Sequence, residues 1–237
     1  MVSCLRQRQS APFAQRKLLR STTRLSRVYS EGGMSRLEAA VEEATARDTY
    51  VMAHAYSDEA VRRCLQAGVR SIEHANFVSE ETVALMGEYG AFFDPTFISL
   101  VQRIESADRT GLSDTVVQNV THAVEQGRTV YGWARKHGVP VALGTDLWGP
   151  DARRSQLREL EIRAELDEPA DILRSATSVN ADLLMMSGQI GTIRTGAFAD
   201  LLVVEGNPLR DVRVLCHPER NLYLVMKDGV IYTDRLS

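Results

Sequence analysis

The sequence predicts an α/β fold, in which residues 31–187 form four short strands alternating with helices and residues 188–237 form a small terminal β-sheet. Three observations lead to this fold class. Apolar residues at helical spacing alternate with short β-prone runs, glycines follow the helices, and the helical pattern gives way to strands past Gly191. Strands separated by helices pair in parallel, so four of them make half of a (β/α)8, TIM-like barrel.

The first predicted helix precedes a strand at residues 49–55. Its apolar side chains recur at helical spacing, at Leu37, Ala40, Val41 and Ala44. Ser57 is expected to cap the next helix, residues 58–67, and Gly68 to follow its end in the C′ position. These cap residues mark the helix ends because they satisfy backbone groups that a helix leaves unpaired.

Further strands and helices complete the predicted half-barrel. Residues 71–74 form a strand, and Ser79, followed by two acids in the first turn, opens a helix that stops at Gly90. The remaining elements are a strand at 91–94, one or two helices within 97–137 and a strand at 139–144.

The pattern changes after Asp146. Two helices are expected at residues 156–166 and 169–186. The terminal β-sheet is predicted from strands at 191–195, 199–204, 222–227 and 230–232, with Asp228-Gly229 as a two-residue hairpin turn.

The composition is that of a globular protein able to bury a sizeable core, since 44% of the 237 residues are hydrophobic and 25% are charged. No run approaches the ~20 apolar residues that cross a bilayer, so no membrane association is expected. Cys4, Cys64 and Cys216 are odd in number and lack C-x-x-C spacing, which argues against a disulfide framework or a thiolate zinc site. They fit a reducing compartment, and we expect a cytoplasmic protein.

The first 30 residues carry six arginines, Lys17 and no acid. The remaining 21 basic and 31 acidic residues give the rest of the chain a net charge of −10, which disfavours nucleic-acid binding. Three interpretations of the basic segment stay open: a mitochondrial transit peptide, a basic nucleic-acid arm, or a disordered or non-native start. We expect the last, with mitochondrial localisation as the alternative if the segment is a transit peptide.

Three residues near predicted strand ends have side chains that bind divalent metals. His54, His74 and Asp146 fall where the strands of a (β/α)8 barrel carry functional groups. Imidazole and carboxylate are ligands of zinc and similar ions, which activate water near neutral pH. The alternative for each histidine alone is a hydrogen-bonded core or loop residue. Asp94, before Pro95, could cap or bind, and we favour a structural role for it.

Tyr56 and Arg153 are candidates for substrate binding. Tyr56 lies two residues beyond His54, where its ring either faces a substrate or packs on the rim. Arg153 and Arg154 could bind a carboxylate, and a solvated helix start explains them at least as well. The remaining histidines are expected to be structural, namely His122, His137 and His217.

Several stretches of the chain stand out as motifs. They are Ala53-His54-Ala55-Tyr56, Ser71-Ile72-Glu73-His74, Leu143-Gly144-Thr145-Asp146 and the pattern G-x-I-x-x-G-x-x-A-D-L-L-V-V at residues 191–204. Residues 207–209 and 225–229 extend the pattern towards the end of the chain. In order and spacing these motifs resemble the C-terminal half of the amidohydrolase superfamily, most closely its imidazolonepropionase-like and Xaa-Pro-dipeptidase-like members. The resemblance covers residues 34–237.

The resemblance implies a metal-dependent hydrolase of carbon–nitrogen bonds. His54 and His74 would bind one or two divalent ions, with zinc the first expectation, and Asp146 would bind metal and shuttle a proton. A metal-activated water would then attack a small-molecule substrate, either a non-peptide amide or an X-Pro dipeptide.

The resemblance also implies ligands that this sequence lacks. A His-x-His pair is expected on the first barrel strand, and none of the five histidines forms one. A strand-end lysine that bridges two metals is expected too, whereas Lys17, Lys136 and Lys227 fall in the basic segment, a helix end and the terminal sheet. We therefore expect a truncated hydrolase that is weakly active or inactive. The alternative is a non-catalytic half-barrel that forms a homo-oligomer or docks to a partner chain, which would cover its strand edges.

Overall fold

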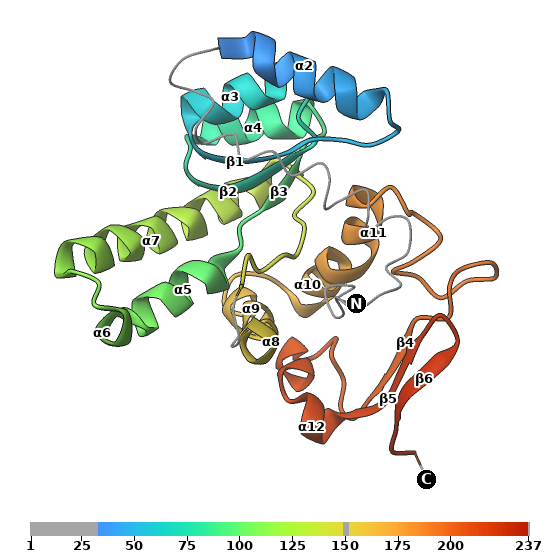
Figure 1. Cartoon of the computed structure of the whole chain (residues 1–237). Helices are drawn as coiled ribbons and strands as arrows, with labels where there is room; N and C mark the ends of the chain where they lie inside the picture. The colour runs from blue at the N-terminus through green and yellow to red at the C-terminus, as the bar shows by residue number, and fades with distance from the viewer. Residues whose placement is uncertain (1–32, 149–151, 237) are drawn as a thin grey trace. The chain divides into compact units, whose positions relative to one another are not determined.

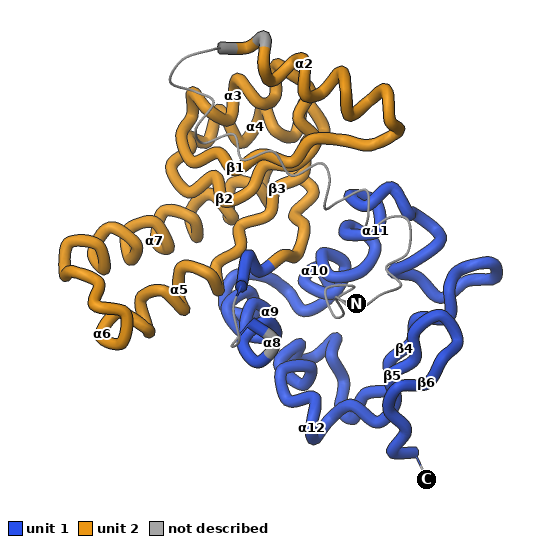
Figure 2. The backbone as a smooth tube through the Cα atoms, in the orientation of Figure 1, with its two compact units in different colours: residues 1–5, 145–237 blue, residues 6–144 orange. Residues whose placement is uncertain are grey.

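A computed structural model of the protein describes residues 33–148 and 152–236. The described residues divide into two compact units: unit 2 ends at residue 144, and unit 1 begins at residue 145 (Figure 2). The predicted basic segment, residues 1–30, lies outside the described residues. The sequence predicted a domain boundary between residues 187 and 188, which is a different division from the one between the two compact units at residue 145. The predicted boundary stays a prediction.

Unit 2 is built on a parallel sheet in the order β1-β2-β3 (Figure 1). Its strands are β1 (Met52–Ser57), β2 (Ser71–Phe77) and β3 (Phe92–Asp94). Ile72 pairs with Ala53 on one side and with Phe93 on the other, and all three side chains are fully buried. The predicted parallel pairing of the first three strands is confirmed.

The predicted fourth strand, residues 139–144, is reduced to one parallel bridge between Phe93 and Val141. Phe93 donates its N–H to the Pro140 carbonyl at 3.0 Å, and its own carbonyl accepts the N–H of Ala142 at 2.8 Å. Pro140 has no N–H with which to extend the ladder. The expectation of a full fourth strand is therefore wrong, although the segment lies where that strand was predicted.

Three helices lie on one side of the sheet in Figure 1, and the second and third begin and end much as predicted. They are α2 (Gly33–Thr45), α3 (Asp58–Gln66) and α4 (Glu80–Glu88). The Ser57 hydroxyl accepts the N–H of Ala60, and the Ser79 hydroxyl accepts that of Thr82. Gly68 follows α3 at a φ of +84°, a left-handed value that glycine adopts without steric cost.

The helical stretch after β3 holds three helices rather than one or two. They are α5 (Phe97–Glu105), α6 (Ala107–Thr110) and α7 (Asp114–Lys136). Gly111, at a φ of +68°, ends α6, and Ser113 caps α7 through the N–H of Val116. The long helix α7 packs against β2, and α5 packs against α7.

Unit 1 begins with a run of short helices. They are α8 (Ala152–Ser155), α9 (Arg158–Arg163), α10 (Pro169–Arg174) and α11 (Asn180–Leu183), with a π-helical segment η2 (Ser175–Val179) between the last two. The single helix predicted for residues 169–186 is therefore interrupted. A fully buried ion pair within α9, Arg163 Nε to Glu159 Oε1 at 2.9 Å, joins adjacent turns of the helix.

Unit 1 ends in an antiparallel sheet in the order β4-β5-β6. Its elements are β4 (Leu201–Val204), the 3-10 helix η3 (Val212–Cys216), α12 (Pro218–Asn221), β5 (Leu222–Lys227) and β6 (Val230–Asp234). Asp228 and Gly229 both have positive φ, as the predicted hairpin turn requires. The strand predicted at 191–195 is wrong, because Gly191 has a φ of +69° and lies too close to the Thr177 carbonyl for a side chain.

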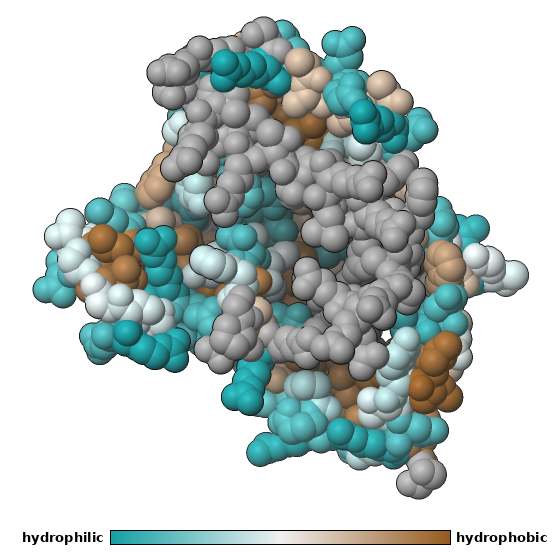
Figure 3. All heavy atoms as spheres, viewed as in Figure 1, coloured by the Kyte–Doolittle hydropathy of each residue, from teal (hydrophilic) through white to brown (hydrophobic). Residues whose placement is uncertain are grey.

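The terminal sheet leaves a row of apolar side chains exposed. Val230, Ile231 and Tyr232 of β6 are each about half exposed, and apolar residues gather over this strand in the space-filling view (Figure 3). Such a row on an edge strand is a typical contact surface.

The predicted α/β class is confirmed, and the described residues form no closed barrel, as a partial barrel requires. Over the same residues, none of the helices is both long and apolar enough to cross a membrane.

Candidate functional site

Two predicted site residues face each other at the carboxyl end of the sheet in unit 2. Nδ1 of His54, from β1, lies 2.7 Å from Nε2 of His74, from β2. The ring centroids are 4.8 Å apart, with 35° between the ring planes. One nitrogen of each ring therefore points at the other ring. The two nitrogens are close enough to bind the same ion.

A local distortion of β2 brings the two rings together. His54 lies opposite Glu73 in the parallel register, and adjacent residues of a regular strand point to opposite faces. His74 and Ala75 have left-handed backbones, with φ of 76° and 45°, and the register with β1 shifts at this point. We attribute the meeting of the two imidazoles to this break in the alternation of side chains.

The His74 ring is held from its other side by Thr96. Nδ1 of His74 lies 2.7 Å from Oγ1 of Thr96, the residue before α5. His74 is 3% exposed, and this burial, with the neighbouring His54 as a second cause, lowers its pKa from 6.5 to about 4. The imidazole is therefore neutral near pH 7, which is the form that binds a metal.

Tyr56 covers the face of His74. The two rings stack at a centroid distance of 4.9 Å with 12° between their planes, and Tyr56 is 40% exposed. The structure thus shows the packing contact that was one of the two expectations for Tyr56. Its role in substrate binding stays a prediction.

Asp94 makes the structural contact that the sequence favoured. Its Oδ1 accepts the N–H of Gly144 at 3.0 Å, which fastens the chain after the reduced fourth strand to the end of β3. A Cβ on Gly144 would overlap the Asp94 carboxylate, so a larger residue here would have to displace that side chain. Sequence reasoning placed Gly144 in a motif without giving it this role.

Asp146 belongs to unit 1, where it has a left-handed φ of 47° and an exposed side chain. Its membership of the same site as the histidines stays a prediction. Arg153 lies in α8, and its side chain is outside the described part of the structure. Arg154 is exposed.

The other histidines take part in contacts away from the pair. His137 Nε2 lies 2.9 Å from Oε1 of Glu80, rather than at the helix-end carbonyls. The His122 ring lies in α7, 5.8 Å from that of Phe77. His217 precedes the short helix α12. The contacts of His137 and His122 are of the structural kind expected for them, and the structural role of His217 stays a prediction.

The donor set of the site consists of two imidazole nitrogens. Imidazole nitrogens suit zinc and similar ions, and the His74 ring is positioned by Thr96 and Tyr56. Within residues 33–148 and 152–236, no group of three or more His, Cys, Asp or Glu side chains could hold a metal ion. The pair fits a metal as a partial set of ligands, so a complete centre needs further donors.

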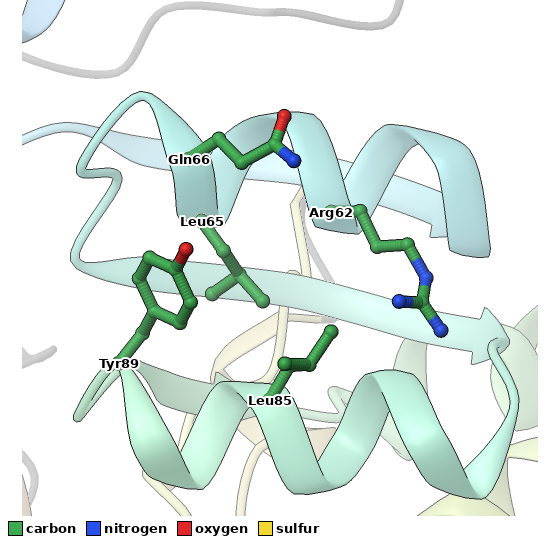
Figure 4. A pocket seen from close by; sticks show the side chains of 5 residues that line it. All are labelled: Arg62, Leu65, Gln66, Leu85 and Tyr89. Atoms are coloured by element: carbon green, nitrogen blue, oxygen red, sulfur yellow. The ribbon is translucent and has the colours of Figure 1, made fainter.

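A separate hollow lies between α3 and α4 (Figure 4). Its lining residues are Arg62, Leu65, Gln66, Leu85 and Tyr89. None of them is a predicted site residue, and the hollow is open to solvent.

A parallel sheet flanked by helices, with two histidines converging at its carboxyl end, makes this an α/β protein. The model of the amidohydrolase family matches residues 31–232, and the chain belongs to that family. This confirms the family expected from the motifs.

Known structures and relatives agree with that assignment. A crystal structure of an amidohydrolase is 38% identical with a TM-score of 0.81, over 86% of this chain and 49% of that one. A prolidase structure, complexed with N-methylphosphonate-L-proline, is 37% identical with a TM-score of 0.80, over 85% and 49%. Ochratoxinase of Aspergillus niger is 29% identical over 210 residues, which are 86% of this chain and 42% of ochratoxinase. The chain therefore spans about half the length of these proteins.

Proposed function

We propose that the site serves metal-dependent hydrolysis of a carbon–nitrogen bond, with X-Pro dipeptides as the substrate class. The observation that carries the proposal is the facing pair His54 and His74, with 2.7 Å between their nitrogens, in a chain of the amidohydrolase family. The similarity of this chain to a prolidase that was solved with N-methylphosphonate-L-proline supports this substrate class. Other carbon–nitrogen bonds, those of non-peptide amides, are the alternative.

In this proposal His54 Nδ1 and His74 Nε2 hold a divalent ion, with zinc the first expectation. Such an ion, when bound, activates a water molecule and polarises the carbonyl under attack. Asp146 contributes a further ligand, takes a proton from the attacking water and passes it to the leaving nitrogen. Tyr56 flanks the substrate from its stacked position on His74, and Arg153 binds the carboxylate of the dipeptide.

We further propose that this chain alone is weakly active or inactive. The two histidines and Asp146 are fewer ligands than a binuclear centre uses, and neither the remaining three histidines nor the three lysines supply the missing types in the expected places. A poorly held ion is expected to reduce the turnover rate more than it reduces the affinity for substrate, because the ion acts on the reacting water.

Zinc binding by the full chain tests the proposal without depending on activity. We expect His54→Ala and His74→Ala to abolish binding measured by competition with a chromophoric chelator. His122→Ala is the matched control, because it removes a histidine of the same unit that lies outside the pair. Equal zinc binding by all four proteins would overturn the proposed centre.

Hydrolysis of Gly-Pro and of an N-acyl amino acid, measured with zinc, tests the reaction. Asp146→Asn should remove any activity of the wild type. Rapid turnover by the wild type, with tight stoichiometric zinc, would contradict the weak activity proposed here.

A second candidate function is that of a non-catalytic half-barrel that associates with a copy of itself. The exposed apolar row Val230, Ile231 and Tyr232 on β6 favours it. Light scattering should then show a dimer that Ile231→Lys dissociates, whereas Ile193→Lys, at a position 87% exposed elsewhere in unit 1, leaves it intact. A monomeric wild-type chain would exclude this function.

A further inference from the structure

The hydroxyl of Thr96 contacts a histidine and does not cap the helix that Thr96 precedes. Thr96 occupies the N-cap position of α5, where a threonine side chain normally accepts a backbone N–H of the first turn. Here the side chain makes no capping bond, and Oγ1 lies 2.7 Å from Nδ1 of His74 instead. The contact spans 22 residues of sequence and joins β2 to the start of α5.

The contact is buried and its backbone is strained. Thr96 and His74 are each 3% exposed. Thr96 has φ 46° and ψ 45°, a left-handed conformation that β-branched residues rarely adopt, and His74 is also left-handed at φ 76°. Strain of this kind persists only where the surroundings hold it, and it gathers at sites with a functional demand.

The chemistry of an imidazole gives this contact a consequence for the opposite nitrogen. Nε2 of His74 faces His54, so it is the nitrogen that a shared ligand would use. A neutral imidazole that gives the Nε2 lone pair to a ligand carries its proton on Nδ1. That buried N–H then needs an acceptor, and Oγ1 of Thr96 is at hydrogen-bonding distance. Because a hydroxyl both donates and accepts, it also serves Nδ1 when the proton is on Nε2.

We propose that Thr96 is a positioning residue of the candidate metal centre, orienting the His74 ring and accepting its Nδ1 proton when Nε2 binds a metal. This role rests on the proposed function as far as the metal is concerned. The hydrogen bond and the ring orientation do not depend on it. Partners of this kind on ligating histidines change metal affinity by about 10- to 100-fold when they are removed.

Three variants of the full chain separate this role from general packing. Thr96→Val keeps the branched shape and removes the hydroxyl, whereas Thr96→Ser keeps the hydroxyl. Thr82→Val is the matched control, because Thr82 is a fully buried threonine of unit 2 whose hydroxyl bonds to Ser79. If loss of a buried hydroxyl weakened zinc binding only by destabilising the fold, Thr82→Val would weaken zinc binding as well. A role specific to the Thr96 hydroxyl predicts weaker binding in Thr96→Val and normal binding in Thr96→Ser.

The first measurement is the ¹⁵N resonance of His74 Nδ1 in metal-free protein at about pH 8.5, well above the ordinary imidazole pKa of about 6.5. We expect Thr96→Val to shift it, and Thr96→Ser and Thr82→Val to leave it near the wild-type position. No shift in Thr96→Val would overturn the hydrogen bond on which the proposal stands.

The second measurement is zinc affinity by chelator competition. We expect Thr96→Val to bind about 10- to 100-fold more weakly than the wild type, and both other variants to bind within about threefold of it. Unchanged affinity in Thr96→Val would overturn the positioning role while the proposed function stands. If the wild type binds no zinc, the proposed function fails and the positioning role towards a metal fails with it, whereas the ¹⁵N result still decides whether Thr96 orients His74.

Discussion

Replacing Gly127 with alanine is expected to destabilise the protein, although alanine normally stabilises a helix interior by about 1 kcal/mol relative to glycine. Gly127 lies in α7 beside the end of β2. A Cβ at this position would lie 2.7 Å from Nδ2 of Asn76 and 3.2 Å from Cε1 of Phe97. Asn76 is fully buried and donates from Nδ2 to the Ala123 carbonyl at 3.1 Å, so it cannot move aside without breaking that bond.

The opposing energies decide the sign of the effect. A buried amide left without its hydrogen bond costs about 1–3 kcal/mol, and crowding a packed core costs a further amount of about 1–3 kcal/mol where the neighbours must shift. Together these exceed the helical gain of about 1 kcal/mol. We expect a net loss of about 1–5 kcal/mol in the free energy of unfolding.

Urea unfolding followed by circular dichroism measures this free energy, and the same helix provides the control. Gly132 has no atom within 4 Å of an added Cβ, so Gly132→Ala should stabilise the protein by about 0.5–1 kcal/mol. Combining Gly127→Ala with Asn76→Ala should remove most of the penalty, because the two positions are in contact. The reasoning is refuted if Gly127→Ala is as stable as Gly132→Ala.

Two further predictions concern unit 1. Glu159→Leu should lower the free energy of unfolding by about 3–5 kcal/mol, because it removes one partner of a fully buried ion pair. Thermal denaturation measures this loss, and a loss no larger than that of Glu43→Gln, in an exposed pair, would contradict it. Burial, and secondarily nearby carboxylates, raise the pKa of Cys216 from 9.0 to about 12, so its thiolate fraction at about pH 8 should be about a thousandfold below that of an ordinary thiol. Iodoacetamide should therefore modify Cys216 slowly in the native chain and faster in urea, as followed by peptide mass. A native rate that levels off near pH 9 would argue against the raised pKa.

The local signals in the sequence predicted the local structure well. Ser57 was expected to cap one helix and Ser79 to open the next, and both hydroxyls accept a backbone N–H of the first turn. The failures arose where one residue type overrides a pattern. Pro140 limits the fourth strand to a single bridge, and Gly191, with its left-handed backbone, replaces the predicted strand by a turn-rich segment. Helix and strand propensities averaged over several residues do not reveal such single positions.

The closeness of His54 and His74 was predictable from the sequence, whereas the contacts that hold them were not. Strand ends in a parallel sheet share one edge, and this alone was enough to bring His54 and His74 together in prediction. The contacts of Thr96 with His74 and of Gly144 with Asp94 span 22 and 50 residues. They depend on left-handed backbones and on close approach, which leave no periodic trace in the sequence. Asp146 and Arg153 stay predictions for the same site.

The 2.7 Å contact between His54 and His74 also bears on how well this chain can hold a metal. A hydrogen bond between two imidazoles needs one donor and one acceptor, so the metal-free pair satisfies two buried or half-buried nitrogens without any ion. The protein can therefore fold without the metal, unlike a domain whose ligands are left unpaired until the ion binds. An ion that takes both nitrogens must first break this bond and displace its proton. With few further ligands to offset that loss, zinc binding by this chain should be weak, which agrees with the low activity proposed from the number of ligands.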